Sequence, residues 1–233
     1  MDINPLKRLA SRLPSLWQQE LKRFRYRCQI RRQTFETTEP EFLILDQLIA
    51  AGDWVIDIGA NVGHYTKRFS DLVGPRGRVI AVEPVPDTFV LLAANVSAFR
   101  YRNVTLLNLA ASDRTAVVGI QIPDFETGLK NYYQAAITTQ ESKIRVLTIA
   151  LDSLALVHRI GLIKIDAEGH DPVVLQGVER LLSRDHPTLI VETSSPAVVE
   201  KLEKLGYRSE RLRGSPNMLF RWFSATTHPL IKA

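Results

Sequence analysis

The stretch Trp-Val-Ile-Asp-Ile-Gly-Ala-Asn-Val-Gly-His-Tyr, residues 54–65, decides the fold of this chain. Its first five residues, Trp54 to Ile58, form a short apolar run with one acid, which is typical of a strand buried on both faces of a parallel sheet. Gly59, Asn61 and Gly63 then predict a turn into a helix, because glycine and, after it, asparagine tolerate positive φ. A strand, a glycine turn and a helix in this order present backbone N–H groups to a ligand.

The glycine spacing and the acid at position 57 indicate the kind of ligand. The dinucleotide fingerprint is G-x-G-x-x-G, whereas this chain has Gly59-x-Asn61-x-Gly63. The carboxylate of Asp57, placed before the glycines, repels a pyrophosphate and attracts an ammonium group. These features favour S-adenosylmethionine, which has an amino group and a cationic sulfur, and make Asp57, Gly59, Asn61 and Gly63 candidate cofactor-binding residues. A tight strand–helix turn without a ligand is the alternative.

A second carboxylate follows the next expected strand, Arg78 to Val82. Glu83 comes 20 residues after Gly63, close to the distance at which an acid at the end of the second strand binds the ribose. One carboxylate accepts hydrogen bonds from both vicinal hydroxyl groups. Glu83 is therefore predicted to hold the ribose, and an ordinary strand-end acid is the alternative.

Several motifs stand in the same order as in a known enzyme family. They are Asp57-Ile-Gly-Ala-Asn-Val-Gly63, Gly77-Arg-Val-Ile-Ala-Val-Glu-Pro84, Leu151-Asp-Ser-Leu154, Lys164-Ile-Asp-Ala-Glu-Gly169 and Ile190-Val-Glu192. With them the chain resembles the FkbM family of S-adenosylmethionine-dependent methyltransferases from about Trp54 to Glu192. The resemblance implies a methyltransferase with S-adenosylmethionine as its cofactor, and it does not specify the substrate.

Alternating strand and helix patterns predict an α/β, Rossmann-like class I methyltransferase fold with a doubly wound, mostly parallel sheet and an antiparallel C-terminal hairpin. Strands are expected at 54–58, 78–82, 104–110, 117–122, 144–149, 162–165 and 189–191, with the hairpin at 207–212 and 218–223. Helices are expected at 39–51 and 64–73 and from residues 86, 171 and 196. Residues 39–233 are predicted to form the methyltransferase domain, and the strand-end acids Asp57, Glu83, Asp166 and Glu192 to face one crevice.

The bulk properties restrict the class of protein. The length of 233 residues fits one domain with an extension. Cys28 is the single cysteine, so no internal disulfide is possible and a reducing, cytoplasmic location is expected. We find no apolar run near the roughly 20 residues that cross a bilayer and no signal-peptide pattern.

Residues 1–38 are predicted to form a basic helical arm. The first 32 residues hold nine Lys or Arg against two acids, a net charge of +7, whereas the whole chain carries +5 and the remainder therefore −2. Apolar residues at helical spacing, with Pro14 as an interruption, predict two short amphipathic helices. Three roles remain open: a flap packed on the core, a membrane-surface helix at the inner face of the membrane, and nucleic-acid binding, for which the arm lacks a recognised module.

Candidate catalytic residues follow the strand that ends at Asp166. Asp166, Glu168 and His170 place three possible bases within five residues. His170 suits neutral pH, since an unperturbed histidine has a pKa of about 6.5, although the resemblance covers Asp166 and Glu168 and not His170. The same triplet is an alternative divalent-metal site, but we predict no metal, because strand alternation points neighbouring residues apart.

Two further regions are candidates for ligand contact. Asp113, after the third expected strand, is a candidate acceptor for the adenine amino group, and a plain turn acid is the alternative. The polar stretch from Pro123 to Ser142, with Tyr132 and Tyr133, is either a substrate lid or a disordered loop.

The leading hypothesis is a methyltransferase that acts on a hydroxyl group of a sugar or natural product. The alternatives are a non-catalytic binding protein that uses the basic arm on a membrane or polymer, and an RNA methyltransferase. The identity of the methyl acceptor and the oligomeric state are not evident from the sequence.

Overall fold

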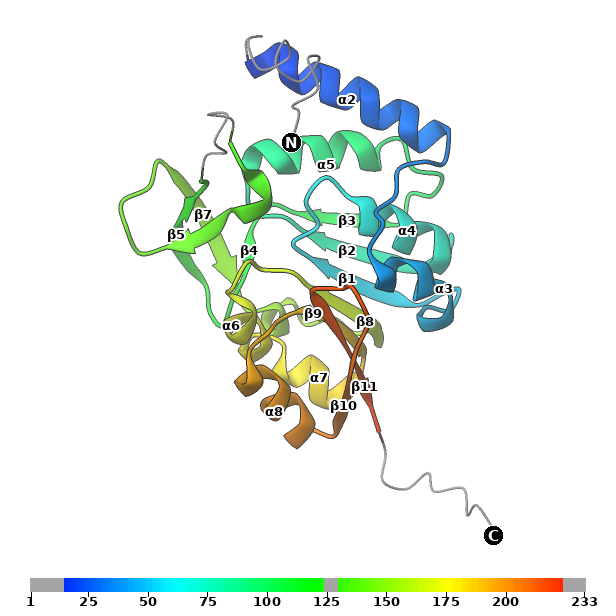
Figure 1. Cartoon of the computed structure of the whole chain (residues 1–233), viewed down its shortest axis with the longest axis vertical. Coiled ribbons are helices and arrows are strands. Elements are labelled where there is room, and N and C mark those ends of the chain that lie inside the picture. Colours follow the sequence, from blue (N-terminus) through cyan, green and yellow to red (C-terminus); the bar gives the residue numbers. More distant parts are fainter. Residues whose placement is uncertain (1–14, 124–129, 224–233) are drawn as a thin grey trace.

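The computed structural model (Figure 1) describes residues 15–123 and 130–223. The first 14 residues of the expected arm, residues 124–129 of the expected lid and residues 224–233 lie outside this part. The described part contains a seven-stranded sheet in the order β10-β11-β9-β8-β1-β2-β3. These strands are β1 (Trp54–Ile58), β2 (Arg78–Val82), β3 (Val104–Leu107), β8 (Ile160–Ile165), β9 (Thr188–Glu192), β10 (Tyr207–Arg211) and β11 (Asn217–Trp222).

The sheet is parallel from β9 to β3, and β11 runs antiparallel to both β9 and β10. The predicted α/β fold with a closing antiparallel hairpin is confirmed. Side chains alternate across the sheet, so that Val55 packs under Phe69 on one face while Ile56 and Ile58 pack with Leu175 on the other. Burial on both faces explains why the central strands read as continuous apolar runs.

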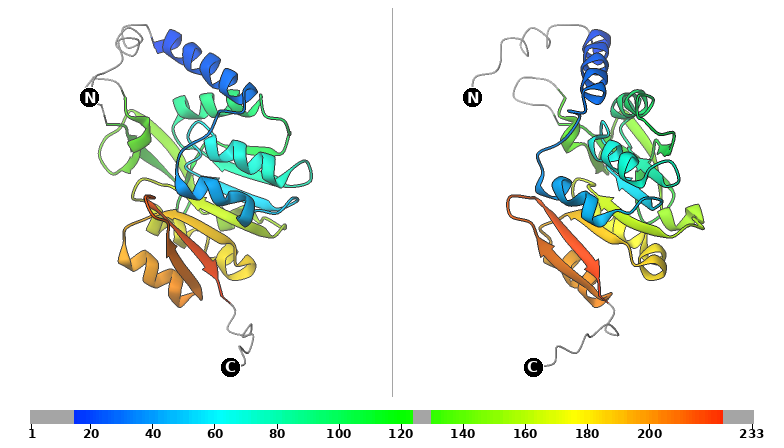
Figure 2. Two further views of the ribbon diagram at one scale, coloured as in Figure 1. Left: turned by 45° about the vertical axis from the view of Figure 1, so that its right-hand side comes forward. Right: turned by 90° about the vertical axis from the view of Figure 1, so that its right-hand side faces the viewer.

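Helices cover both faces of this sheet (Figure 2). One face carries the 3₁₀ helix η1 (Pro40–Ile44), α3 (Leu45–Leu48), α4 (His64–Val73) and α5 (Pro86–Val96). The other carries the 3₁₀ helix η3 (Leu151–Leu154), α6 (Asp171–Gln176), α7 (Glu179–Asp185) and α8 (Pro196–Lys204). Helices on both faces of a mostly parallel sheet make the fold doubly wound.

A second sheet of four strands, which the sequence did not reveal as a separate unit, stands beside the C-terminal ends of β1 and β2 (Figure 1). It has the order β4-β7-β5-β6, with β4 (Ala110–Ala111), β5 (Ala116–Gln121), β6 (Ala136–Thr138) and β7 (Ile144–Ile149). The expected third strand at 104–110 is thus wrong at its end, because the chain leaves the large sheet after Leu107 and pairs with β7 at Ala110. The expected lid contributes the 3₁₀ helix η2 (Tyr132–Gln134) and β6.

Two predicted helices differ from those observed. The helix expected at 39–51 is only η1 followed by α3, and the backbone is already extended at Ile49. The helix expected from residue 171 to about 182 is divided into α6 and α7 at Gly177. A Cβ atom at position 177 would lie 1.8 Å from the carbonyl oxygen of Ser112, so this close approach of two backbone segments fixes where α6 ends.

In the described part of the expected basic arm the chain forms the helix α2 (Ser15–Arg31). It packs on the outer side of α5, where Tyr26 and Ile30 meet Leu91 (Figure 2). The boundary between an arm of residues 1–38 and a domain of residues 39–233 stays a prediction. Among the described helices, none has the length and apolar character needed to span a bilayer.

A buried carboxylate ties the segment before β1 to the C-terminal hairpin. Glu41 in η1 is 1% exposed and accepts hydrogen bonds from the Tyr65 hydroxyl (3.0 Å), from the Ser215 hydroxyl (2.6 Å) and from the side-chain amide of Asn217. Asn217 begins β11, Ser215 precedes it by two residues, and Tyr65 lies in α4. The Ser215 and Asn217 donors therefore depend on one acceptor, whereas the Tyr65 hydroxyl also has Glu39 within reach, at 2.5 Å.

Replacement of Glu41 by alanine is expected to lower the free energy of unfolding by about 3 kcal/mol, because buried donors then lose their partner. Urea unfolding of the variant measures the loss. Glu36→Ala is the matched control, since Glu36 is exposed, and its free energy of unfolding is expected to change by less than about 0.5 kcal/mol. Equal unfolding midpoints for the two variants would contradict the prediction.

Candidate active site

The predicted glycine turn follows β1. Gly59, Asn61 and Gly63 have φ angles of +77°, +49° and +97°, so the chain uses glycine or asparagine where the left-handed region requires it. A Cβ atom at position 59 would lie 1.9 Å from the carbonyl oxygen of Asp166. This contact between the ends of β1 and β8 leaves bare backbone at the turn, as the sequence predicts for a ligand-binding loop.

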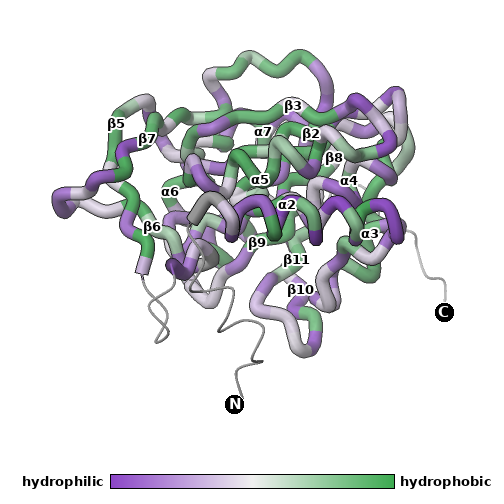
Figure 3. Tube along the Cα trace, turned by 90° about the horizontal axis from the view of Figure 1, so that it is seen from above, coloured by the Kyte–Doolittle hydropathy of each residue, from purple (hydrophilic) through white to green (hydrophobic). Residues whose placement is uncertain are grey.

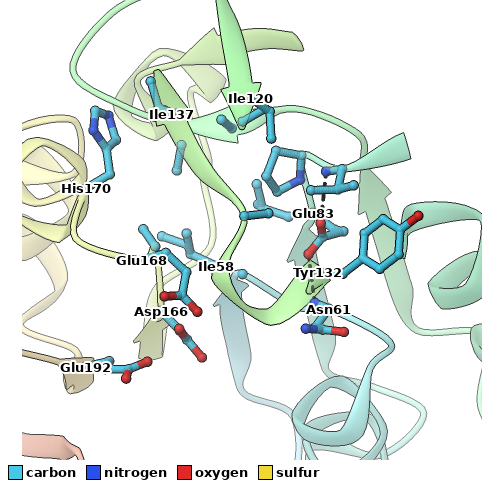
Figure 4. Close-up of a pocket in the computed structure, with 18 of the residues that line it drawn as sticks. Ile58, Asn61, Glu83, Ile120, Tyr132, Ile137, Asp166, Glu168, His170 and Glu192 are labelled. Carbon is cyan, nitrogen blue, oxygen red and sulfur yellow. Dashed lines mark hydrogen bonds between the residues drawn. The ribbon is translucent and has the colours of Figure 1, made fainter. Parts of the chain in front are cut away.

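A cleft opens above this turn, at the C-terminal ends of β1, β2 and β8 (Figure 4). Its empty volume is about 900 Å³, part of it open to solvent. The second sheet supplies the apolar side chains of Ile120 and Ile137 on the side of the cleft opposite Asp166 (Figure 4). Predicted site residues that line this cleft are Gly59, Asn61, Glu83, Asp166, Glu168 and His170.

Glu83 forms one end of the cleft. One carboxylate oxygen accepts from the backbone N–H of Val85 and the other from that of Asn61, both at 2.9 Å. These two bonds fix the carboxylate and leave further lone pairs for ligand hydroxyl groups. Burial raises the pKa of Glu83 to about 7, although both backbone bonds favour the ionised form.

Three carboxylates converge at the other end of the cleft (Figure 4): those of Asp166, Glu168 and Glu192 each have an oxygen within 4.8 Å of the others. A hydrogen bond to Asp166, followed by burial, raises the pKa of Glu192 to about 8. Glu192 is thus protonated at neutral pH and donates to an ionised Asp166. Such a cluster suits an ammonium group, a hydroxyl group or a divalent cation.

A buried lysine neutralises part of this charge. Lys164 precedes Asp166 by two residues, is 2% exposed, and donates to the Asp166 carboxylate at 2.7 Å. Its neighbour across the β1–β8 pair is Asp57, and its ammonium lies 4.7 Å from the ring centre of Tyr65. Burial lowers the pKa of Lys164, but the Asp166 and Asp57 carboxylates outweigh it and the net shift is upward, so the lysine remains charged.

The expected direct contact of Asp57 with the ligand is not supported, because its side chain is 0% exposed and does not line the cleft. Strand alternation directs it to the α4 side of the sheet, where it accepts from the Thr66 hydroxyl at 2.6 Å. Its other oxygen has no hydrogen-bond partner among the described residues. Burial raises the pKa of Asp57, and the positive charge of Lys164 opposes this rise. Asp57 therefore lies beneath the cleft and is not part of its lining.

Glu168 lies on a strained loop. Its φ is +47°, a region that a glutamate rarely adopts. The loop is held from behind by Asp171, whose carboxylate accepts from the backbone N–H of Ala167 at 3.0 Å and of Gly169 at 3.2 Å. Partial loss of solvent and the nearby Asp166 and Asp171 carboxylates raise the pKa of Glu168 to about 7. Glu168 can therefore exchange a proton near neutral pH.

His170 lies at the rim of the cleft. Its Nε2 is 3.0 Å from the hydroxyl of Ser112, and burial lowers its pKa, so the ring is neutral at pH 7. Asp113 does not line the cleft and pairs instead with Arg114 at 3.2 Å. The expected adenine contact of Asp113 is thus not supported, because the turn after β4 directs this acid toward its neighbours.

Glu39 lines the cleft but was not among the predicted site residues, whereas Tyr132, which also lines it, was a predicted candidate for ligand contact. Glu39 accepts from the Tyr65 hydroxyl at 2.5 Å, and Tyr132 donates to Asp87 at 3.0 Å. Glu192 was expected in the crevice but without a role. No local motif marks Glu39, whereas the two adjacent tyrosines in a polar stretch did signal the position of Tyr132.

This combination of fold and cleft defines the class of S-adenosylmethionine-dependent methyltransferases: a Rossmann-like sheet whose first strand ends in a glycine turn and whose second ends in a fixed acid. Residues 57–209 match the methyltransferase FkbM domain. The chain therefore belongs to the FkbM methyltransferase family, and the predictions of a methyltransferase domain and of S-adenosylmethionine as its cofactor are confirmed at this level.

Comparison with solved structures supports the fold. The crystal structure of methyltransferase FkbM from Methylobacillus flagellatus KT superposes with a TM-score of 0.54 at 15% identity, covering 93% of this chain and 57% of that chain.

Two curated proteins match part of the sequence. A protein-L-isoaspartate O-methyltransferase of Methanothrix thermoacetophila is 30% identical over 76 residues, 32% of this chain and 36% of that protein. A protein-L-isoaspartate O-methyltransferase of Archaeoglobus fulgidus is 34% identical over 56 residues, 24% and 26% of the two proteins. The chain thus spans about a third or less of the curated relatives it matches.

The residues present fit S-adenosylmethionine. Glu83 offers free lone pairs for the ribose, Gly59 leaves room at the backbone, and the acids around Asp166 suit the amino and sulfonium groups. Glu168, with its pKa of about 7, is the group of this site that can take up a proton.

Carboxyl-selective NMR is expected to show Glu168 titrating at about 7. The Asp166→Asn variant, which removes a nearby negative charge, is expected to lower this pKa, because the ionised form of Glu168 is then less disfavoured. Asp113→Asn is the control, since Asp113 does not line the cleft, and should leave the titration in place. A midpoint near the ordinary glutamate value of 4.5 would disprove the assignment.

Replacement of Lys164 by methionine is expected to lower the free energy of unfolding by about 3–5 kcal/mol, because it leaves the Asp57 and Asp166 carboxylates without their counter-ion. Chemical denaturation provides the measurement. The control Lys201→Met breaks an exposed pair with Glu179 and should cost less than about 1 kcal/mol. Equal losses in both variants would show that the buried charge has no special role.

Proposed function

We propose that this chain transfers the methyl group of S-adenosylmethionine to a hydroxyl group of a small molecule, a sugar or a natural product. The observation that carries the proposal is the cleft with Glu83 at one end and the Asp166, Glu168 and Glu192 cluster at the other. Membership in the FkbM family supports methyl transfer. Oxygen as the acceptor atom is supported by the names of the partial relatives, which are O-methyltransferases.

In this mechanism the protein aligns the reactants and removes a proton. The cofactor supplies a methyl group on a cationic sulfur, which is a good leaving group. Glu83 would hold the ribose, and Glu168 would take up the proton that the acceptor hydroxyl loses when it is methylated. The neutral ring of His170, 3.0 Å from Ser112, is the alternative base. Ile120 and Ile137 of the second sheet limit access of water.

We also propose a cytoplasmic location. The single cysteine, Cys28, is free, which fits a reducing compartment.

Isothermal titration with S-adenosylmethionine tests the cofactor role of Glu83. Glu83→Gln is expected to weaken binding about 10- to 100-fold, because a charged acceptor of two hydroxyl groups is lost. Affinity of the unmodified chain should fall as the pH is lowered through about 7, where Glu83 gains a proton, and this dependence should be weaker in Glu83→Gln, where only the other acids of the cleft still titrate. Glu36→Gln, an exposed change outside the cleft, is the control. Unchanged affinity in Glu83→Gln would sink the proposal for this residue.

Transfer itself is tested with S-adenosylmethionine labelled at the methyl group and a panel of saccharides and hydroxylated natural products. Label in a product that resists mild base indicates an ether and supports the proposal, whereas base-labile label indicates a carboxyl acceptor. Glu168→Gln should lose transfer even when S-adenosylmethionine is saturating. Label found only in RNA would favour the RNA methyltransferase alternative.

A further inference from the structure

Helix α2 has two apolar faces, and the described part of the chain covers one of them. Tyr26 and Ile30 pack on α5. Trp17, Leu21 and Phe24 lie at spacings of four and three residues, on one side of the helix, and are 66%, 50% and 70% exposed. Because two residues correspond to about 200° of rotation, this exposed stripe points away from the α5 contact. Figure 3 shows α2 as an outer layer of the molecule, with hydrophobic positions along it.

Cationic side chains flank this stripe. Arg25 and Arg27 are exposed and fall about a quarter turn to either side of it, at 100° per residue. Between residues 15 and 32 there are six basic residues and one acid, Glu20, which pairs with Arg23 at 2.6 Å. The stripe therefore lies on the most basic part of a chain whose residues beyond 32 carry a net charge of −2.

We propose that this face of α2 docks in the plane of an anionic phospholipid surface. Tryptophan, leucine and phenylalanine on one side of a helix, with arginines at both borders, fit the boundary between acyl chains and negative headgroups. Arginine stems lie along apolar surface while their charged ends reach the headgroups. A second copy of the chain is a poorer occupant, since two such faces would bring their arginines together.

Docking through α2 would act next to the cleft. The ammonium of Lys22 lies 5.7 Å from the ring centre of Tyr132, which lines the cleft. The helix that would lie on the membrane thus contacts a cleft wall from its other side. The docking proposal stands independently of methyl transfer, because it rests on the exposed stripe and its charges.

Flotation of the full chain with vesicles tests the proposal, with no cofactor present. Vesicles of phosphatidylserine and phosphatidylcholine in equal parts are compared with pure phosphatidylcholine. The chain is expected to bind only the anionic vesicles, and the bound fraction should fall as salt is raised. Brominated phosphatidylcholine in the anionic vesicles should quench tryptophan fluorescence, and Trp17→Phe should remove that quenching while binding persists.

Matched variants distinguish binding through the stripe from non-specific adsorption to the vesicles. The double change Trp17→Ala, Phe24→Ala is expected to weaken partitioning by at least about tenfold. Val117→Ala with Val157→Ala, at residues that are 57% and 87% exposed elsewhere, should leave it unchanged. Arg25→Gln and Arg27→Gln should each weaken it about fivefold, and the exposed Arg213→Gln should not. Circular dichroism checks that all variants are folded.

Four outcomes would overturn the proposal. One is absence of binding to anionic vesicles by folded protein, and another is binding that the stripe variants leave unchanged. A third is Trp17 that is not quenched by brominated lipid, which would mean that another segment covers the stripe. The last is another occupant of the face. A dimer in solution that Trp17→Ala, Phe24→Ala dissociates would assign the face to a second copy, and RNA binding that only the arginine variants weaken would assign it to nucleic acid.

Discussion

The ion pair of Lys164 with Asp166 is the interaction on which the site depends. An ammonium that is 2% exposed is stable in the core only with carboxylates beside it, and here Asp166 follows two residues later while Asp57 is its partner across β1 and β8. The pair keeps Asp166 ionised, since Lys164 and the hydrogen bond from Glu192 outweigh the effect of burial and hold the pKa of Asp166 below its usual value. From this fixed charge follows the proton on Glu192, and the same charge adds to burial in raising the pKa of Glu168.

Each of the two sheets forms one side of the cleft. The large sheet places polar groups at its C-terminal edge, because the ends of parallel strands meet there. It cannot close the space above them, and the chain leaves it after Leu107 to build the small sheet, whose Ile120 and Ile137 face the carboxylates (Figure 4). Gly177 secures this junction, since its bare backbone touches Ser112 directly beyond β4. One side of the cleft is thus polar and fixed, and the other apolar.

The sequence predicted what is encoded locally. The strand 54–58, the turn at Gly59, Asn61 and Gly63 and the acid Glu83 all follow from short-range patterns, and the structure has them in place. The predicted contact of Asp57 with the ligand follows from its position near the end of the strand. Strand alternation instead directs its side chain to the α4 side of the sheet. The pairing of the small sheet and the contact of Glu192 with Glu168 join residues far apart in the chain and were not predicted, although the strand-end acids Asp166 and Glu192 were expected in one crevice.

The charge of the cleft also distinguishes a sulfonium ligand, whose sulfur is cationic, from the product of methyl transfer, whose sulfur is neutral. Glu83, Asp166, Glu168 and Glu192 line it, whereas Lys164, the cation paired with this group, is buried and already engaged by Asp166. A site with this excess of acids attracts a ligand that carries a positive sulfur, and the attraction weakens when methyl transfer makes the sulfur neutral. Burial is the main cause of the raised pKa values of Glu83 and Glu168, and the hydrogen bond to Asp166 is that of Glu192; repulsion between the acids adds to each shift, and a proton or a cation relieves it. The ligand that fits best is therefore one that brings that charge and loses it in the reaction.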